Sequence, residues 1–122
     1  MITEFNLEEK FSKIHEYWTP KIVGELNGQY VKLAKGKGEL IWHSHEEEDE
    51  LFFIVKGTLV MEFRDKTTET NAGEILIIPQ GVEHKPSTKA DEEVWIMLFE
   101  PKETKHTGEI QHEKTVTNLE WI

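Results

Sequence analysis

The chain has 122 residues, and its 24 acidic and 14 basic side chains give a net charge of −10, which repels polyphosphate backbones and argues against nucleic acid as a partner. It has no cysteine, so disulfide bonds and thiolate metal sites are excluded. No apolar run approaches the ~18 residues that span a bilayer, and the acidic N-terminus lacks a secretory pattern. We therefore expect a cytoplasmic protein without membrane contact, folded as one domain over residues 1–122.

Residues 1–20 are expected to form a helical segment ahead of the main fold. Asn6 is a candidate N-cap, Glu9 follows three residues later, and Pro20 ends the pattern. Apolar residues recur at helical spacing on one face of residues 6–18, namely Leu7, Phe11, Ile14 and Trp18. The pattern predicts one short N-terminal helix.

The following residues have the period of two that is typical of strands. Strands are expected over residues 21–26, 29–35, 39–45, 50–56, 58–64, 66–70, 74–78, 83–88 and 93–100. The dipeptide Asn27-Gly28 favours a type I′ hairpin between the first two. Many short strands with little helix predict an all-β antiparallel sandwich or barrel over residues 21–100. The tail, residues 101–122, is polar until its last apolar residues, which are expected to pack onto the domain or onto a neighbour.

Three histidines and one glutamate are candidate metal ligands. Alternation along residues 39–45 places His43 and His45 on one face, and Glu50 begins the next expected strand. His84 follows the turn at residues 79–81 and could be brought in by a further strand. Three imidazole nitrogens and one carboxylate oxygen suit Fe, Mn, Ni, Cu or Zn. Taken singly, each histidine could instead be solvated, and Glu50 could extend the acidic run at 46–49.

The same residues resemble the two motifs of the cupin superfamily. The first motif, His-x-His followed by a glutamate and a glycine, stands here as His43-Ser44-His45, Glu50 and Gly57. The second motif, a glycine, Pro-x-Gly and a histidine, stands as Gly73, Pro79-Gln80-Gly81 and His84. Two positions depart from the pattern. The leading glycine of the first motif is Gly36 or Gly38, each one residue off the usual spacing, and Thr88 stands where an asparagine is common.

The resemblance implies an antiparallel double-stranded β-helix, the jelly-roll barrel of the cupins, with a small molecule bound inside it. It implies one divalent metal ion of undetermined identity, with the ligands His43, His45, Glu50 and His84. Small cupins commonly dimerise, so the resemblance also implies a homodimer, and the segments 21–35 and 119–122 are the interface candidates.

Apolar side chains near the ligands in this alternation are candidates for lining the pocket: Ile41, Phe52, Ile54, Met61, Phe63, Trp95 and Met97. A plain barrel core contains the same residue types, so this interpretation remains open beside the functional one.

Several functional classes remain open. The first is a metal-dependent oxygenase or isomerase that acts on a small carbonyl- or carboxylate-bearing molecule. The second is a non-catalytic cupin module that binds or senses a small molecule or the metal, and the third is a purely structural metal. Small cupins of this kind are often labelled similar to mannose-6-phosphate isomerase. Arg64 is the only arginine of the chain, which disfavours a phosphate-bearing substrate. No catalytic residue is assigned.

Overall fold

The computed structural model describes residues 2–102 and 119–122, which contain one helix and nine strands. The helix α1 spans Leu7–Phe11. The strands are β1 (Lys21–Leu26), β2 (Gln29–Gly36), β3 (Glu50–Lys56), β4 (Thr58–Glu62), β5 (Thr67–Asn71), β6 (Ile75–Ile78), β7 (Lys85–Ser87), β8 (Val94–Pro101) and β9 (Glu120–Trp121).

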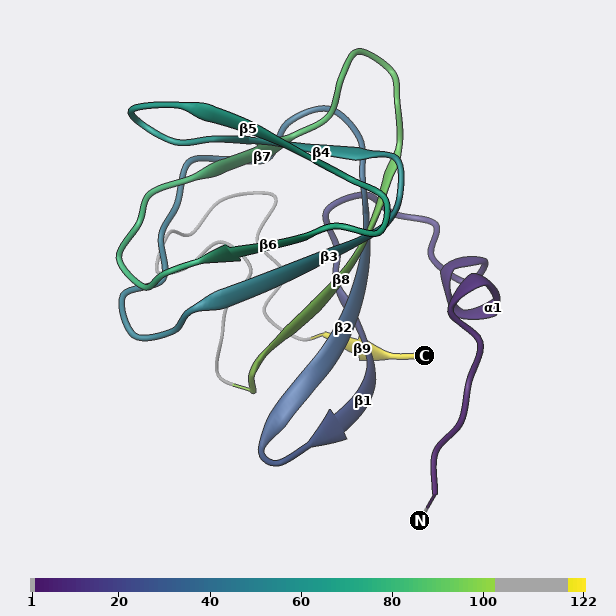
Figure 1. Cartoon of the computed structure of the whole chain (residues 1–122). Coiled ribbons are helices and arrows are strands. Elements are labelled where there is room, and N and C mark those ends of the chain that lie inside the picture. The colour runs from purple at the N-terminus through teal and green to yellow at the C-terminus, as the bar shows by residue number, and fades with distance from the viewer. Residues whose placement is uncertain (1, 103–118) are drawn as a thin grey trace.

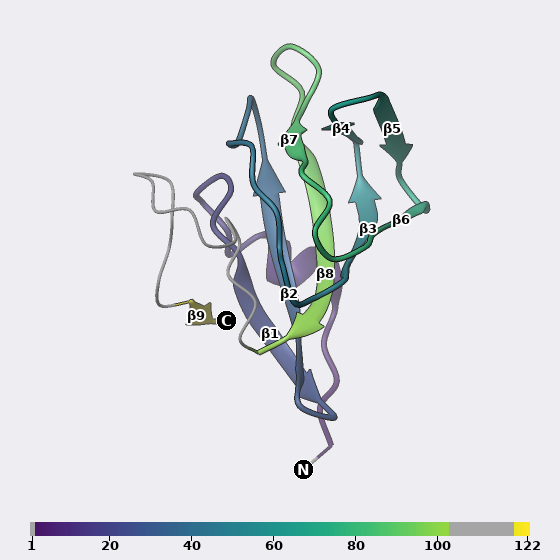
Figure 2. The ribbon, with the colours of Figure 1, turned by 90° about the vertical axis from the view of Figure 1, so that its left-hand side faces the viewer.

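The strands form two sheets on either side of the barrel interior (Figure 1). One has six strands in the order β6-β3-β8-β2-β1-β9, and the other has three in the order β5-β4-β7. The chain passes from one sheet to the other four times, between β3 and β4, β5 and β6, β6 and β7, and β7 and β8, and Figure 2 shows these strands from the side. Crossing of this kind is the topology of the double-stranded β-helix, so the predicted all-β fold is confirmed.

The hairpin predicted at Asn27-Gly28 joins β1 to β2. Both residues have positive φ, +50° and +76°, as a type I′ turn requires. From this turn β2 pairs with β8 along its whole length, from Gln29 opposite Pro101 to Gly36 opposite Val94. The hairpin therefore sets the register between β1 and β2, and β2 in turn pairs with β8 at the centre of the larger sheet.

The expected strand over residues 39–45 is not a regular strand, and this prediction is wrong. The segment runs antiparallel beside residues 84–88, where Leu40 N–H donates to the Pro86 carbonyl at 2.9 Å. Pro86 has no N–H to donate in return. Isolated bridges pair residue 39 with 87 and residue 43 with 84, so the register shifts by one residue between them. The proline and the shift together interrupt the ladder.

The helix is shorter than the predicted span 6–18. Asn6 caps it as expected, because its side chain accepts the N–H of Glu9 at 3.0 Å. Beyond Phe11 the backbone leaves the helix, and Trp18 N–H donates to the Lys35 carbonyl of β2 at 2.7 Å. Trp18 adopts φ +53°. Tertiary pairing with β2 therefore overrides the helical pattern.

The last residues pack back onto the domain. Strand β9 lies parallel to β1, and Ile122 N–H donates to the Ile22 carbonyl at 3.0 Å. The Lys10 ammonium of the N-terminal segment donates to the Ile122 carbonyl at 2.7 Å. Residues 103–118 of the predicted tail lie outside the described residues. The candidate interface segment 119–122 is thus paired within its own chain.

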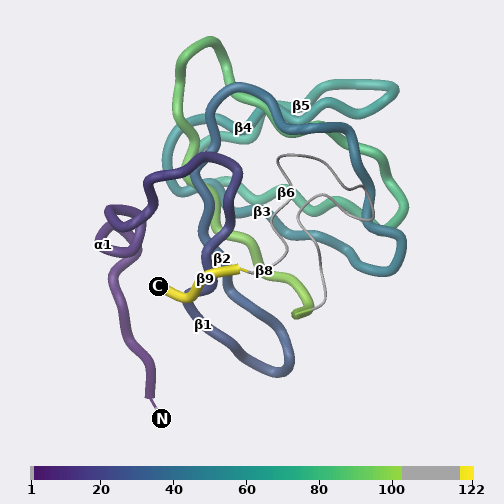
Figure 3. Tube along the Cα trace, turned by 180° about the vertical axis from the view of Figure 1, so that it is seen from behind, coloured from purple at the N-terminus to yellow at the C-terminus, as the bar shows by residue number. Residues whose placement is uncertain are grey.

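Two apolar clusters stabilise the fold. The first fills the space between the sheets and contains Trp18, Ala34, Leu40, Phe52, Ile54, Leu59, Met61, Ile78, Val94, Ile96 and Leu98. The second lies between the N-terminal segment and the outer face of the larger sheet, and its buried members are Phe11, Ile14, Val23 and Leu33. Phe11 stacks on Trp95 with ring centroids 4.7 Å apart. Figure 3 shows α1 outside the barrel, so it covers the sheet and stays away from the interior.

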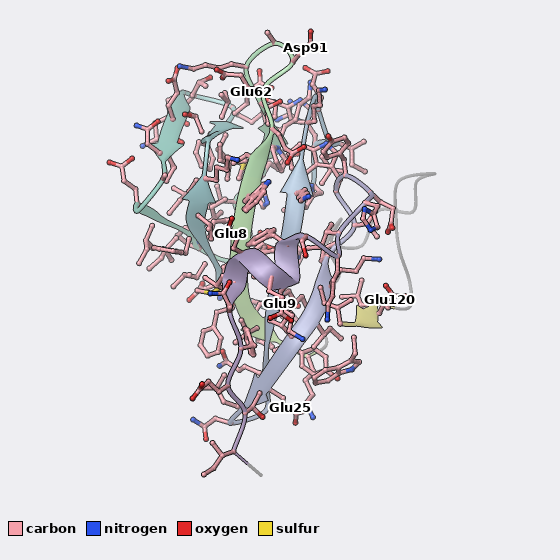
Figure 4. All side chains as sticks on the ribbon, turned by 90° about the vertical axis from the view of Figure 1, so that its right-hand side faces the viewer. Glu8, Glu9, Glu25, Glu62, Asp91 and Glu120 are labelled. Atoms are coloured by element: carbon pink, nitrogen blue, oxygen red, sulfur yellow. The ribbon has the colours of Figure 1, made fainter. Side chains whose placement is uncertain are left out.

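Acidic side chains are spread over the outside of the molecule. Figure 4 labels six of them: Glu8 and Glu9 on α1, which faces the viewer, and Glu25, Glu62, Asp91 and Glu120 elsewhere on the molecule. Five are exposed and Glu62 is partly exposed. The net negative charge is thus mainly a property of the surface, and charged groups inside the barrel need a separate explanation.

Candidate metal centre

His43 and His84 are held together by their own backbones. The N–H of each donates to the carbonyl of the other, at 3.0 Å and 2.9 Å. A reciprocal antiparallel pair of this kind places both side chains on the same face. The two ring centroids are 4.4 Å apart. The isolated bridge between two irregular segments is therefore what brings together a histidine from each cupin-like motif.

His45 and Glu50 reach the same point from neighbouring positions. The Gly81 N–H donates to the His45 carbonyl at 2.8 Å, and Gly81 has φ +80°, which glycine adopts without strain. The Pro-x-Gly turn thus fixes the backbone of His45. Glu50 is the first residue of β3, where it pairs with Ile78 of β6, and alternation turns its side chain inwards together with Phe52.

The four side chains form a compact, buried group. We call it the His/Glu cluster, and its members are His43, His45, Glu50 and His84. One ligand atom from each lies within 4.8 Å of all the others, and every member is at most 5% exposed. The Nε2 atoms of His45 and His84 are 3.1 Å and 3.3 Å from the two Glu50 oxygens. An ion that holds its ligands at about 2.1 Å keeps neighbouring ligand atoms about 3 Å apart.

Backbone carbonyls set the tautomers of two histidines. His43 Nδ1 lies 2.8 Å from the Ile41 carbonyl, and His84 Nδ1 lies 2.9 Å from the Val82 carbonyl. A carbonyl only accepts, so each Nδ1 carries the proton and donates it. In a neutral imidazole the lone pair then sits on Nε2, ready to bind a cation.

The cluster leaves polar atoms buried without hydrogen bonds. Among the described residues, His45 Nε2, His84 Nε2 and Glu50 Oε1 have no hydrogen-bond partner. Burial of such atoms without a partner costs about 1–3 kcal/mol each. A divalent cation would satisfy all of them at once, so the donor set fits the predicted metal ion. The identity of that metal is not determined by these ligands.

The electrostatics of the cluster favour neutral His43 and ionised Glu50 near neutral pH, which are the forms that bind a metal ion. Burial, followed by the proximity of His84, lowers the pKa of His43 to about 4. Burial acts to raise the pKa of Glu50, but the contacts with His45 and His84 outweigh it and hold that pKa well below its usual value. Burial opposes protonation of His45 as well, yet Glu50 raises the pKa of His45 overall. A bound cation would therefore compete with a proton at His45.

The lowered pKa of His43 predicts a pH dependence for the metal-free protein. The unfolded chain protonates His43 near pH 6.5, whereas the folded chain resists until about pH 4. The stability that this group contributes is present above pH 6.5, and about 3 kcal/mol of it is lost as the pH falls towards 4. Urea unfolding in the presence of a chelator measures this free energy. Between pH 7 and pH 4, the free energy of unfolding should fall less steeply for His43→Asn than for the unaltered protein. The control His15→Asn changes an exposed histidine, and its free energy of unfolding should depend on pH as in the unaltered protein. The same pH dependence in all three proteins would contradict the buried, neutral state of His43.

A small cavity opens on the His/Glu cluster. It has a volume of ≈ 40 Å³, and its wall includes His43 and Glu50. The other lining residues are mostly apolar: Trp18, Pro20, Ala34, Leu40, Phe52, Pro86, Ile96 and Leu98. One water needs about 10–15 Å³, so the cavity has room for only a few non-hydrogen atoms beside the cluster.

The residues predicted to line the pocket divide into three groups. Phe52 lines this cavity. The apolar cluster between the sheets contains Ile54 and Met61, and Ile41 and Phe63 pack against it. Trp95 and Met97 pack against the second apolar cluster, which lies under the N-terminal segment. The period of two along β8 is as predicted, but Ile96 and Leu98 are the residues that face the cavity. Both faces of β8 are apolar, so the pattern alone could not choose between them.

A larger hollow of ≈ 400 Å³ lies on the surface side of Glu50. Glu47, Glu48 and Asp49 contribute to its lining, and Glu50 is common to the hollow and the cavity. Carboxylates gathered around an opening raise the local concentration of cations. The acidic run thus lies where it would favour entry of a metal ion, a role that was not predicted from the sequence.

A buried ion pair inside the barrel was not predicted from the sequence. Lys32 of β2 and Glu100 of β8 are each 1% exposed, and Lys32 Nζ lies 3.0 Å from Glu100 Oε1. Lysine and glutamate are almost never fully buried unless they are paired. The available signal was the period of two, which groups Lys32 with Ala34 and Glu100 with Leu98 on the inward faces.

Residues 29–100 match the family described as Cupin domain (Cupin_2), and the chain belongs to this family. A solved structure, a cupin-2 domain containing protein from Shewanella frigidimarina NCIMB 400, is 44% identical with a TM-score of 0.77, covering 80% of this chain and 94% of that one. Protein NMB1881 from Neisseria meningitidis is 29% identical with a TM-score of 0.73, covering 82% of this chain and all of that one.

A curated relative is the Bacillus subtilis (strain 168) protein named "Uncharacterized protein YdbB". It is 41% identical over 64 residues, which make up 52% of this chain and 57% of YdbB, so the alignment spans little more than half of that relative. In the part of the chain that the structure describes, no helix has the length and apolarity needed to cross a membrane.

Proposed function

We propose that this cupin is a metal-dependent enzyme, an oxygenase or an isomerase, that binds one divalent ion in the His/Glu cluster and acts on a small carbonyl- or carboxylate-bearing molecule. The observation that carries the proposal is the set of buried, unpartnered ligand atoms, His45 Nε2, His84 Nε2 and Glu50 Oε1, beside an apolar cavity. A purely structural ion needs no adjoining cavity, whereas this cavity is lined by two of the proposed ligands, His43 and Glu50.

The charge of the centre favours an anionic or strongly polarised ligand. Three neutral histidines, one glutamate and a divalent ion sum to a local charge of about +1. When bound, such an ion supplies Lewis-acid polarisation of a carbonyl, or binding of dioxygen if it is iron. The protein's own contribution is to hold Nε2 of His43 and His84 towards the ion through their Nδ1 hydrogen bonds.

The cavity favours a small substrate with a short apolar part. Its volume of ≈ 40 Å³ matches a few non-hydrogen atoms, and its apolar walls exclude water from the reacting group. A carboxylate or carbonyl would face the cluster, and the apolar end would face Phe52 and Leu98. A short 2-oxo acid such as pyruvate has this size and polarity.

A phosphate-bearing substrate is disfavoured by the placement of the cationic side chains. Arg64 stacks over the Trp42 ring at 3.9 Å and pairs with Glu83, and its side chain is 60% exposed. Lys85 pairs with Glu39 at 3.1 Å. Neither residue lines the cavity, so neither is placed to hold a phosphate there.

The size limit can be tested with a matched pair of core variants. Leu98→Ala widens the cavity, whereas Leu59→Ala removes the same atoms from a residue of the same apolar cluster that does not line it. Each substitution is expected to cost about 2–5 kcal/mol of stability. With Co²⁺-loaded protein, visible spectra should report binding of formate and acetate to all three proteins, and binding of benzoate to Leu98→Ala alone. Benzoate binding to the unaltered protein with the affinity of acetate would contradict the proposed substrate size.

Turnover separates an enzyme from the alternative, a cupin module that binds or senses a small molecule without catalysis. The loaded protein should exchange the methyl protons of pyruvate with D₂O, as followed by NMR, or consume dioxygen when loaded with iron. Ligand binding with neither reaction, across a panel of short 2-oxo acids, would favour the binding module. The cytoplasmic location, the homodimer and the single domain over residues 1–122 stay predictions.

A further inference from the structure

One wall of the apolar cavity is a residue that does not belong to the barrel. The walls contributed by β2, β3 and β8 are parts of the larger sheet, whereas Trp18 comes from the N-terminal segment, ahead of β1. Trp18 is only 8% exposed and belongs to the apolar cluster between the sheets. The size of the cavity therefore depends on a side chain that the N-terminal segment brings into the barrel.

The strand register places Trp18 at the end of the cavity that is remote from the His/Glu cluster. On the inward face of β3, Phe52 follows Glu50, and Phe52 pairs with Leu98 of β8. Two inward positions further along β8, the strand reaches the level of Gly36 in β2. The Trp18 ring lies directly against Gly36. Since inward positions repeat about every 6–7 Å along a strand, this level lies well beyond Leu98 as seen from Glu50.

The backbone and a glycine hold the indole ring at this place. The N–H of Trp18 donates to the Lys35 carbonyl at 2.7 Å, and its ring Nε1 donates to the Lys37 carbonyl at 3.0 Å. A Cβ on Gly36 would lie 2.5 Å from Cη2 of the ring. Gly36 does not have a positive φ, so the ring requires glycine there and the backbone does not. Trp18 itself has φ +53°, which is unfavourable for a bulky side chain.

We propose that Trp18 is a specificity-determining residue, which sets the length of the apolar part of the substrate, and that Gly36 is a positioning residue for its indole ring. The inference rests on the proposed function, because it requires a carboxylate or carbonyl at the His/Glu cluster and an apolar end directed along β8. The cavity then limits two dimensions separately. Leu98 limits the width beside the cluster, and Trp18 limits the length.

The test is the binding of straight-chain carboxylates to the Co²⁺-loaded protein, measured from the visible spectrum with acetate, butyrate and hexanoate. The unaltered protein should bind acetate more tightly than hexanoate. Trp18→Ala should bind hexanoate about tenfold more tightly than the unaltered protein does, with the affinity for acetate unchanged, because each newly buried CH₂ contributes about fourfold. Trp18→Phe should gain affinity for butyrate but not for hexanoate. A role limited to core packing predicts no gain that depends on chain length.

Trp95→Phe is the matched control for Trp18→Phe. It shortens another tryptophan, which stacks on Phe11 at 4.7 Å outside the barrel and does not line the cavity. Its preference for chain length should equal that of the unaltered protein. An equal gain in butyrate affinity for Trp95→Phe would assign the effect to general loosening of the fold and would overturn the role of Trp18.

Gly36→Ala tests the positioning role in the metal-free protein, without any ligand. The urea midpoint should fall in Gly36→Ala, because the added Cβ collides with the ring. In a Trp18→Ala background the same substitution should change the midpoint little, because the colliding ring is gone. Equal losses in the two backgrounds would overturn the positioning role of Gly36.

The outcomes for Trp18 and for the proposed function can be told apart. If Trp18→Ala does not fold, Trp18→Phe and butyrate supply the comparison. The same dependence of affinity on chain length in the unaltered protein and the Trp18 variants would overturn the role of Trp18, while the metal site and the small substrate stand. A Co²⁺-loaded, unaltered protein that binds none of the three carboxylates would overturn the proposed function together with this inference.

Discussion

Replacing His84 with alanine is expected to reduce the affinity for a divalent ion by at least about 100-fold, because even partners behind a ligand cost 10–100-fold when they are lost. His84 is 1% exposed, and its Nε2 is one of the unpartnered atoms of the cluster. Reciprocal backbone hydrogen bonds with His43 hold residue 84 in place, so alanine at this position leaves its ligand position empty. Competition of Co²⁺ or Zn²⁺ between the protein and a chromophoric chelator measures the change.

The matched control is His15→Ala, which removes an exposed histidine outside the cluster. Its metal affinity should equal that of the unaltered protein, and circular dichroism should show the same β-rich fold in both variants. If His84→Ala bound the ion as tightly as His15→Ala does, His84 would not be a ligand.

Gly57→Ala is expected to destabilise the fold by about 3 kcal/mol or more. Gly57 has φ +83°, a region that costs other residues about 1–3 kcal/mol. An added Cβ would also collide with the carbonyl oxygen of Glu93 and lie 3.3 Å from Cα of Val94. Both neighbours are backbone atoms next to or within β8, so neither can give way without moving a central strand. Chemical denaturation of the metal-free protein measures the loss.

Gly73→Ala separates the collision from the backbone strain. Gly73 has nearly the same φ, +86°, but nothing lies within 4 Å of the position of its Cβ. Its substitution should cost only about 1–2 kcal/mol. Equal losses at the two positions would show that the close approach of Glu93 to Gly57 contributes nothing to stability.

Local signals predicted most of the strands but failed where tertiary contacts decide. The hairpin at Asn27-Gly28 follows from two positive φ angles that these residues favour, and it was predicted. The segment 39–45 alternates like a strand, yet its neighbour contains Pro86 and a register shift, which no pattern within 39–45 reveals. The predicted helix ended early because Trp18 pairs with β2, a partner distant in sequence.

The candidate ligands were predictable because two spaced motifs agree, whereas the surroundings of the site were not. Nothing in the motifs indicates that Trp18 closes the cavity from the N-terminal segment. On β8 both faces are apolar, so Trp95 and Met97 were assigned to the cavity in place of Ile96 and Leu98. These features depend on which face of a strand points to the interior. When both faces are apolar, the sequence pattern does not show which one that is, and the packing of the whole fold decides it.

The most direct test of the metal site is the elemental content of the protein purified without chelators. The buried, unpartnered atoms of His45, Glu50 and His84 predict close to one divalent transition-metal ion per chain, removed by prolonged dialysis against a chelator and regained on reconstitution. The metal found would also choose between oxygen chemistry and Lewis-acid chemistry. A protein that carries no iron, manganese, nickel, copper or zinc, and takes up none of them at micromolar concentration, would contradict the assignment of the His/Glu cluster as a metal centre.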